Sequence, residues 1–175
     1  MSTVNQEFTT ILLDMYGVIL EESKGNFIPY TYGHFKEKEW ERLTRQFKQE
    51  QLFTKAGNGE MSSDTFLSML GFDDPGDHMR DYLSHYLTLD SDFITFAENY
   101  YQKYDFVLLS NDVSEWSAFI TEHYQLDKYF SVKIVSGDVK CRKPEREIYP
   151  VLFNRDHVEY SGKIVNSFPE LGEIL

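Results

Sequence analysis

Apolar residues along this chain follow two patterns, short continuous runs and stripes with helical spacing. The short runs cover residues 11–20 (ILLDMYGVIL), 106–109 (FVLL), 132–135 (VKIV) and 163–165 (KIV). Short apolar runs are typical of strands that are buried on both faces of a parallel sheet. The runs therefore predict four strands, and the first ends where Asp14 precedes a tight loop at Gly17.

The stretch after the first strand predicts a group of helices. Residues 21–32 mix glycine, proline and charges without a period, which indicates a connecting loop. Three helical stripes follow, separated by predicted turns at 56–60 and 73–76. Their apolar positions are Phe35, Trp40, Leu43, Phe47 and Leu52; Phe66, Leu67, Met69 and Leu70; and Met79, Tyr82, Leu83, Tyr86 and Leu87. Residues 21–88 therefore predict a small helical insertion, whose many aromatic side chains we expect mainly to pack.

Strands and helices alternate after this insertion. Helices are predicted over residues 93–101, 114–124 and 145–153, the first with Asp90 or Ser91 as its cap, and residues 136–142 are predicted as a loop. Such alternation implies a parallel sheet with right-handed crossovers. We therefore predict an α/β fold, a Rossmann-like parallel sheet with helices on both faces.

Polar residues follow several of the predicted strands. Asp14 ends the first strand, Ser110 and Asn111 end the second, and Asn166 follows the fourth. The loop after the third strand leads to Lys143. Because open α/β sheets bind ligands at the carboxyl ends of their strands, we expect these residues to converge at one edge of the sheet.

The composition narrows the classes of partner. The formal charge of −12, from 29 acidic and 17 basic residues, repels a phosphate backbone and an anionic membrane surface alike. No apolar run approaches the roughly 20 residues of a membrane span, and the first ten residues lack the pattern of a secretory signal. We therefore expect no nucleic acid or membrane partner, and a cytoplasmic protein that is a monomer or a homodimer.

Three motifs, taken in order, resemble those of one enzyme family. An apolar strand leads into Asp-x-Tyr-Gly-Val at Asp14, a second leads into Leu-Ser-Asn at Ser110, and Lys-Pro stands before a predicted helix at Lys143. Lys143 lies 33 residues after Ser110. This order and spacing is similar to the haloacid dehalogenase (HAD) superfamily of hydrolases over residues 11–153. The resemblance implies an α/β core of residues 1–20 and 89–175, with residues 21–88 as a helical cap.

The resemblance also assigns roles at the site. Asp14 would be the nucleophile that forms an aspartyl ester or phosphate, and a carboxylate can do this when the substrate is held in line with it. Ser110 and the backbone amides around Asn111 would donate hydrogen bonds to a phosphoryl or carboxylate group. Lys143 would supply the positive charge that keeps Asp14 ionised beside an anionic substrate.

A magnesium ion is a further implication of the resemblance. In family phosphatases the metal is bound by the nucleophile, a backbone carbonyl two residues later and an acid after the fourth strand. These positions correspond here to Asp14, Tyr16 and Asn166. Asn166 offers only a neutral oxygen, whereas magnesium sites usually include one or two carboxylates.

Two departures from the phosphatase pattern affect the reaction. Tyr16 stands where phosphatases have a second Asp that protonates the leaving group, and a tyrosine at this position is also found in the metal-independent dehalogenase branch. Val18 stands where those dehalogenases usually have threonine. The tail KIVNSFPELGEIL lacks the usual acidic pair, so we expect a shortened end of the sheet and a C-terminus altered by truncation or frameshift after about Gly162.

Three functions remain open from the sequence. The first is a HAD-like hydrolase that uses Asp14 on a small anionic substrate, most simply a phosphate ester. The second is a metal-independent 2-haloacid dehalogenase, for which Arg45 is the candidate partner of the substrate carboxylate. The third is a catalytically silent binding or scaffold domain that retains the sheet.

Overall fold

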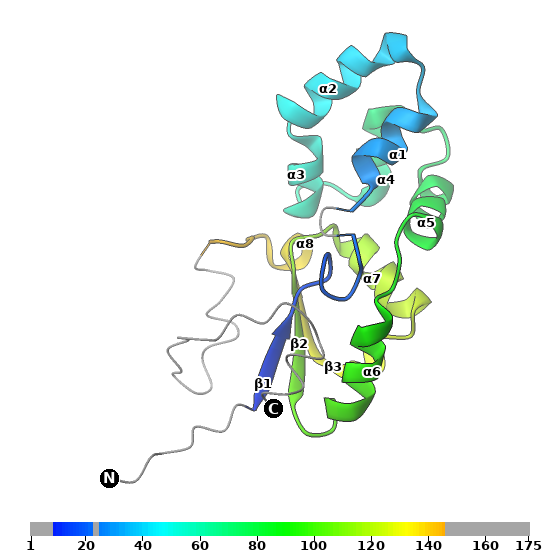
Figure 1. The fold of residues 1–175 in the computed structure, drawn as a ribbon. Helices are drawn as coiled ribbons and strands as arrows, with labels where there is room; N and C mark the ends of the chain where they lie inside the picture. The colour runs from blue at the N-terminus through cyan, green and yellow to red at the C-terminus, as the bar shows by residue number, and fades with distance from the viewer. Residues whose placement is uncertain (1–8, 23–24, 146–175) are drawn as a thin grey trace.

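A computed structural model describes residues 9–22 and 25–145 of the chain. Within them lies a parallel sheet with the strand order β1-β2-β3, shown in Figure 1. The strands are β1 (Thr10–Leu13), β2 (Asp105–Ser110) and β3 (Phe130–Val135). Leu13 is paired with Leu108 and Leu109 with Ile134, so the three strands end at the same edge. The predicted α/β fold with a parallel sheet is confirmed, while the strand at 163–165 and the helix at 145–153 fall outside the described residues.

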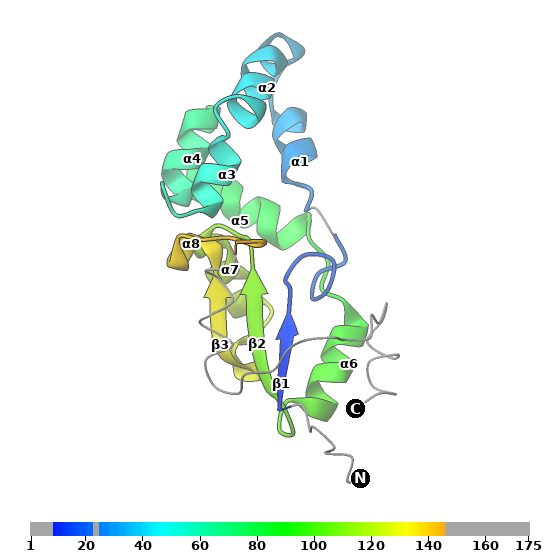
Figure 2. The same ribbon diagram turned by 90° about the vertical axis from the view of Figure 1, so that its left-hand side faces the viewer.

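The helices form two groups around this sheet. They are α1 (Phe27–His34), α2 (Trp40–Lys48), α3 (Leu52–Gly57), α4 (Ser63–Leu70), α5 (Pro75–His85), α6 (Ser91–Tyr100), α7 (Ser114–His123) and α8 (Ser136–Val139), with 3-10 turns at Glu37–Glu39 and Asp127–Tyr129. Figures 1 and 2 show α1 to α5, here called the helical unit, beyond the carboxyl ends of the strands. In both views α6 and α7 lie alongside the strands. The helical unit therefore stands over the edge where the polar residues converge.

Several helix ends follow the capping signals in the sequence. The Ser62 hydroxyl accepts a hydrogen bond from Thr65 N at the start of α4, and Gly71 ends that helix with a φ of 99°. The Asp90 carboxylate accepts hydrogen bonds from Asp92 N and Phe93 N at the start of α6. These two boundaries are confirmed because the capping bonds are local and the residue types are specific to them.

Other local predictions were wrong. The predicted loop over 21–32 contains α1, because Phe27, Tyr30 and Thr31 bury one face of that helix against the rest of the protein. The long first stripe is broken into a 3-10 turn, α2 and α3, and Gln51 adopts a φ of 54° at the break. The predicted loop over 136–142 begins with the single turn α8. For α1, tertiary packing overrode the local pattern.

The two faces of the sheet are packed differently. Phe106 and Leu108 of β2 belong to the main core, where the Phe106 ring stacks on Phe96 of α6 with 5.5 Å between centroids. Val107 and Leu109 point to the other face and form a separate small cluster with Ile134. The alternation explains why β2 is apolar at every position from 106 to 109, as expected for a strand buried on both faces.

Aromatic side chains hold the helical unit on the α/β core. The ring of Phe27 lies 5.5 Å from that of Phe66 and 4.8 Å from that of Trp116, which belongs to α7 of the core. Trp116 is fully buried, and its Nε1 donates a hydrogen bond of 2.7 Å to Ser63 Oγ at the start of α4. The expectation that the aromatic residues mainly pack is confirmed for this cluster.

The chain crosses between the core and the helical unit twice, and the crossings run side by side. Glu21 N donates to Thr88 O at 3.0 Å, and Asp90 N donates to Ile19 O at 3.0 Å. The Glu22 carboxylate accepts hydrogen bonds from both the amide and the hydroxyl of Thr88. The paired crossings fix where the helical unit leaves the sheet.

Across the described part of the chain, every helix is too short or too polar to cross a lipid bilayer.

Candidate active site

Asp14 is the first residue after β1, at the edge of the sheet that faces the helical unit. Its Oδ2 lies 2.6 Å from Lys143 Nζ, and its Oδ1 accepts a hydrogen bond of 2.8 Å from Met15 N. The next turn depends on Gly17, which has a φ of 75° and donates from its amide to Leu20 O. The Asp14 side chain remains 40% exposed. It is therefore paired with a cation and still accessible to a ligand.

Lys143 is held at this position by the end of β2. The Asn111 side chain accepts a hydrogen bond from Lys143 N at 2.8 Å and donates one to Lys143 O at 3.0 Å. Lys143 Nζ also donates to Leu109 O at 2.9 Å. Two of the three ammonium N–H groups therefore have identified acceptors, Asp14 and Leu109. The structure brings together Asp14, Asn111 and Lys143 as predicted, but it uses the Asn111 side chain to position Lys143.

Ser110 is the last residue of β2 and is completely buried. Its Oγ has no hydrogen-bond partner within the described residues. A buried hydroxyl without a partner costs about 1–3 kcal/mol, so such groups are usually satisfied by a further donor or acceptor. The predicted contact of Ser110 with a substrate remains a prediction, and its hydroxyl is not committed elsewhere in the described structure.

Asp112 is a site residue to which the sequence analysis gave no role. It is only 4% exposed, and its carboxylate accepts hydrogen bonds from Val113 N at 2.8 Å, Ser117 Oγ at 2.7 Å and the Tyr16 hydroxyl at 3.3 Å. Burial raises the pKa of Asp112 to about 7 against the opposing effect of these hydrogen bonds, and the charge of Asp14 adds to the rise. The only signal in the sequence is the polar triplet 110–112 at the end of a strand.

Tyr16 is directed at Asp112 through its hydroxyl. Burial is the main cause that holds the pKa of Tyr16 well above its ordinary value, and the nearby Asp112 charge raises it further. At neutral pH Tyr16 is therefore a protonated phenol that donates to Asp112. The side chain that stands two residues after Asp14 is committed to a buried carboxylate.

The described residues do not by themselves complete a magnesium site. Among residues 9–22 and 25–145, no three His, Cys, Asp or Glu side chains are grouped so that they could hold a metal ion. Asp14 contributes one carboxylate, whereas the Asp112 oxygens accept bonds from N–H and O–H groups. The Tyr16 carbonyl remains a predicted ligand, and Asn166 lies outside the described residues.

Arg45 lies in a different part of the molecule. It belongs to α2, which both views place at the end of the helical unit farthest from the strands (Figures 1 and 2). Its Nε lies 3.2 Å from Glu50 Oε1 in an exposed ion pair. The structure therefore does not bring Arg45 to Asp14, and its predicted contact with a substrate carboxylate has no geometric support in this conformation.

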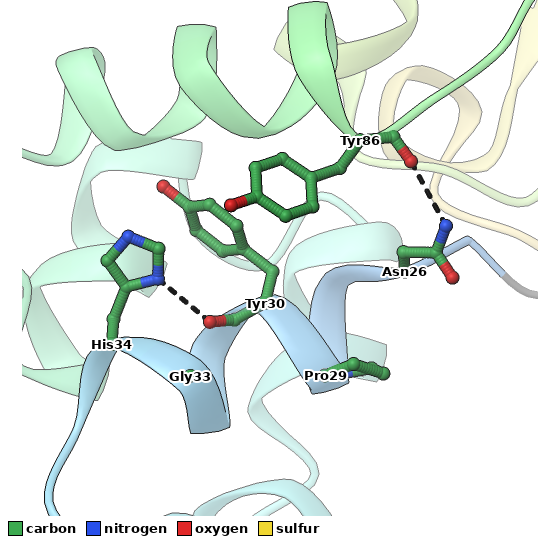
Figure 3. A pocket seen from close by; sticks show the side chains of 6 residues that line it. All are labelled: Asn26, Pro29, Tyr30, Gly33, His34 and Tyr86. Carbon is green, nitrogen blue, oxygen red and sulfur yellow. Dashed lines mark hydrogen bonds between the residues drawn. The ribbon is translucent and has the colours of Figure 1, made fainter.

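A separate hollow of about 290 Å³ lies on the helical unit. Figure 3 shows its lining, in which the rings of Tyr30 and Tyr86 lie beside His34. The His34 Nδ1 is 2.8 Å from Tyr30 O, and the Asn26 amide donates to Tyr86 O at 3.1 Å. This hollow contains none of the residues around Asp14, so it is not part of the candidate active site.

The chain matches known proteins in structure but not in sequence. No family model and no curated protein matches it in sequence. Among solved structures, the HAD family enzyme bt-2542 from Bacteroides thetaiotaomicron superimposes with a TM-score of 0.71 at 16% identity, over 88% of this chain and 81% of that one. The chain has a HAD-superfamily fold.

Two other solved structures with the HAD fold show how varied this group is. The putative HAD-hydrolase YfnB from Bacillus subtilis, solved bound to magnesium, has a TM-score of 0.57 at 15% identity, over 97% of this chain and 99% of that one. The L-2-haloacid dehalogenase from Xanthobacter autotrophicus has a TM-score of 0.54 at 16% identity, over 87% and 66% of the two chains. The predicted HAD fold is confirmed, and the reaction must be argued from the site.

Proposed function

We propose that this HAD-fold chain is a hydrolase in which Asp14 is the nucleophile and the substrate is a small phosphate ester. The observation that carries this proposal is the ion pair of 2.6 Å between Asp14 and Lys143, in which the Asp14 side chain stays 40% exposed. A carboxylate that is both paired with a cation and accessible at the end of a parallel strand is suited to nucleophilic attack.

The surrounding groups fit an anionic substrate. Lys143 places a positive charge beside Asp14, and its remaining N–H is a donor that a phosphoryl oxygen can accept from. The Ser110 hydroxyl, which is buried and has no partner within the described residues, is the predicted second donor. Asp14 would attack phosphorus, the ester bond would break, and water would then release phosphate from the aspartyl phosphate. The bt-2542 enzyme, which has the same fold, has been solved in complex with magnesium and inorganic phosphate, which supports a phosphoryl substrate.

Magnesium is part of the proposal only to a limited extent. A bound magnesium ion supplies charge neutralisation for a phosphoryl group. Because the described residues provide one carboxylate and no cluster of three acidic or imidazole groups, no step of the proposed reaction depends on the metal. The residues that would hold it are Asp14 and the Tyr16 carbonyl, with Asn166 as the predicted third ligand.

We assign the helical unit the role of a cap over this site. Its α3 helix reaches the core at Gly57, whose carbonyl accepts a hydrogen bond from Ser136 Oγ of α8. The same Ser136 hydroxyl accepts a hydrogen bond from Asp112 N at 3.0 Å. The helical unit is therefore connected to the loop that carries Ser110, Asn111 and Asp112. In the role of a cap it would exclude water and select substrates.

The test is phosphate release from a panel of phosphate esters, measured with magnesium for the wild type and for Asp14→Asn. The amide is close to isosteric with the carboxylate but cannot act as the nucleophile, so we expect turnover in the wild type alone. Equal phosphate release by the two proteins would refute the proposal. Thermal unfolding of both proteins controls for loss of fold.

A second candidate is metal-independent dehalogenation of a 2-haloacid. Tyr16 favours it, because the nucleophile of a dehalogenase displaces a halide that needs no proton, and the Xanthobacter autotrophicus dehalogenase has the same fold. The test is chloride release from 2-chloropropionate in the presence of a chelator, again with Asp14→Asn as control. Chloride release that depends on Asp14 and exceeds phosphate release would select this candidate over the first.

A further inference from the structure

Within residues 9–22 and 25–145, two of the groups near Asp14 that could move a proton, Tyr16 and Asp112, are bonded to each other. The Tyr16 hydroxyl has a single proton, and its partner is the Asp112 carboxylate at 3.3 Å. The Asp112 carboxylate in turn accepts bonds from Ser117 and Val113 and is buried. A tyrosine that donates its proton to a buried carboxylate does not donate it to the leaving group of a substrate.

Lys143 lies beside the attacking carboxylate of Asp14 and not on the side from which a leaving group departs. In an in-line displacement the leaving atom departs opposite the attacking atom. Lys143 Nζ lies 2.6 Å from Asp14 Oδ2, so it sits beside the attacking carboxylate. A second Nζ proton is directed at the Leu109 carbonyl. Lys143 therefore stabilises charge on the attacking side, and its position does not fit a proton donor to the departing group.

From this arrangement we infer that the substrate is an acyl phosphate, a mixed anhydride of a carboxylic acid and phosphate, whose leaving group departs as an unprotonated carboxylate. The inference rests on the proposed use of Asp14 as nucleophile, and it makes a mixed anhydride, in place of the phosphate ester of an alcohol, the preferred phosphoryl substrate of that site. Carboxylic acids have pKa values near 4, so a carboxylate leaves at neutral pH without a proton. An alkoxide leaving group has no such stability and requires general acid catalysis.

The chemistry of both steps balances without a proton donor. Asp14 attacks phosphorus, the bond from phosphorus to the acyl oxygen breaks, and the electron pair leaves with the carboxylate of the substrate. The aspartyl phosphate formed is itself an acyl phosphate, so the first step exchanges one carboxylate for another. Water then attacks phosphorus, the Asp14 carboxylate departs with its electron pair, and both protons of the attacking water remain on the dihydrogen phosphate product.

The experiment measures kcat/KM for acetyl phosphate, for aryl phosphates with leaving groups of increasing pKa, and for glycerol phosphate. In the wild type we expect kcat/KM to fall steeply along this series, with glycerol phosphate at least about 10²-fold below acetyl phosphate, the low end of what a general acid contributes. A flat series in the wild type, with turnover that still depends on Asp14, would overturn the inference while leaving the proposed function in place.

Two variants of Tyr16 separate the interpretations. In Tyr16→Phe the ratio of acetyl phosphate to glycerol phosphate activity should stay within about threefold of the wild type, because the hydroxyl does not act on the leaving group. A selective loss of glycerol phosphate turnover of tenfold or more would identify Tyr16 as the acid and contradict the inference. Tyr16→Asp, which places a carboxylic acid beside Asp14, should raise glycerol phosphate turnover relative to acetyl phosphate, and an unchanged ratio would count against it.

Failure of the proposed function gives a different result. If Asp14→Asn and the wild type release phosphate from acetyl phosphate at the same rate, Asp14 is not the nucleophile, and the proposed function and the inference both fail. Near-ultraviolet circular dichroism of each variant establishes that a change in ratio arises in a folded protein.

Discussion

Two aspartates at the ends of neighbouring strands have opposite environments. Asp14 follows β1, is 40% exposed along its side chain and lies 2.6 Å from the Lys143 ammonium. Asp112 follows β2, is 4% exposed and is bonded to hydroxyl and amide groups. The same residue type is therefore an accessible partner of a cation in one place and a buried structural acceptor in the other. Pairing with a cation and access to solvent suit Asp14 to its proposed role as nucleophile, whereas burial among neutral donors suits Asp112 to holding separate segments together, here called the anchor role.

The hydrogen bonds of Asp112 also explain how separate segments are held together. Asp112 connects the loop after β1 through Tyr16 with α7 through Ser117. Its main-chain amide donates to Ser136 Oγ, whose hydroxyl contacts the Gly57 carbonyl of the helical unit. Removing the Asp112 side chain should therefore affect folding more than chemistry, and removing the Asp14 side chain should do the reverse. The predictions below test this contrast.

The largest effect on activity is expected for Asp14→Asn. Loss of the proposed nucleophile should lower kcat by at least about 10³-fold, because the remaining groups would only bind and orient the substrate. The midpoint of denaturant unfolding should change little, since the side chain is partly solvated. Steady-state kinetics and urea unfolding measure the two quantities, and a large loss of stability would remove the contrast with Asp112.

Lys143→Met should have the next largest effect on activity. It removes the cation beside Asp14, so kcat/KM should fall by about 10²- to 10³-fold, in the range reported for one electrostatic group in an active site. The fold should persist because Asn111 binds the main chain of residue 143 and not its side chain. Lys143→Arg is the matched control: it keeps the charge and should recover part of the activity. No difference between the two variants would show that the charge is unimportant.

Asp112→Ala should mainly lower stability. The change leaves Ser117 Oγ, Val113 N and the Tyr16 hydroxyl without their acceptor, which corresponds to a loss of about 2–4 kcal/mol in the free energy of unfolding. Urea unfolding gives this value directly. A loss comparable to that of Asp14→Asn would indicate that Asp112 is not an anchor.

The pH dependence of stability gives a second test of Asp112. Its pKa rises from 3.8 in the unfolded chain to about 7 in the folded one, so the folded protein retains a proton that the unfolded chain releases. This contribution to stability is complete below pH 3.8 and is lost as the pH rises to about 7. The ionisable groups that act on Asp112 are Tyr16, Asp14 and Tyr82. Asp112→Asn should abolish this decline, whereas an unchanged pH profile would assign it to other groups.

Tyr16→Phe should have the smallest effect. It removes one hydrogen bond of 3.3 Å to Asp112, which is worth about 1 kcal/mol in the free energy of unfolding. The pKa of Asp112 should rise further because that bond favours the ionised carboxylate. Unfolding measured at pH 6 and pH 8 tests both expectations. A stabilised Tyr16→Phe protein would show that the bond does not contribute to the anchor.

The fold class could be predicted from the sequence because strand burial leaves a local signature. Residues 106–109 are apolar at each position, as β2 is covered on both faces, and Asp90 and Ser62 cap helices through bonds within three residues. Helix α1 could not be predicted in this way, because its helical conformation is stabilised by the burial of Phe27 against residues distant in sequence.

The sequence by itself determined which residues meet at the edge of the sheet. Parallel strands bring their carboxyl ends together, so the positions of Asp14, Ser110 and Asn111 followed from the strand pattern, and a family resemblance added Lys143. Only the tertiary structure decided how these residues are used. The bond between Tyr16 and Asp112 joins residues 96 positions apart, and no local period encodes it. Burial raises the pKa of Asp112, whereas the Asp14 side chain is left 40% exposed. This difference in burial arises only when the chain is folded.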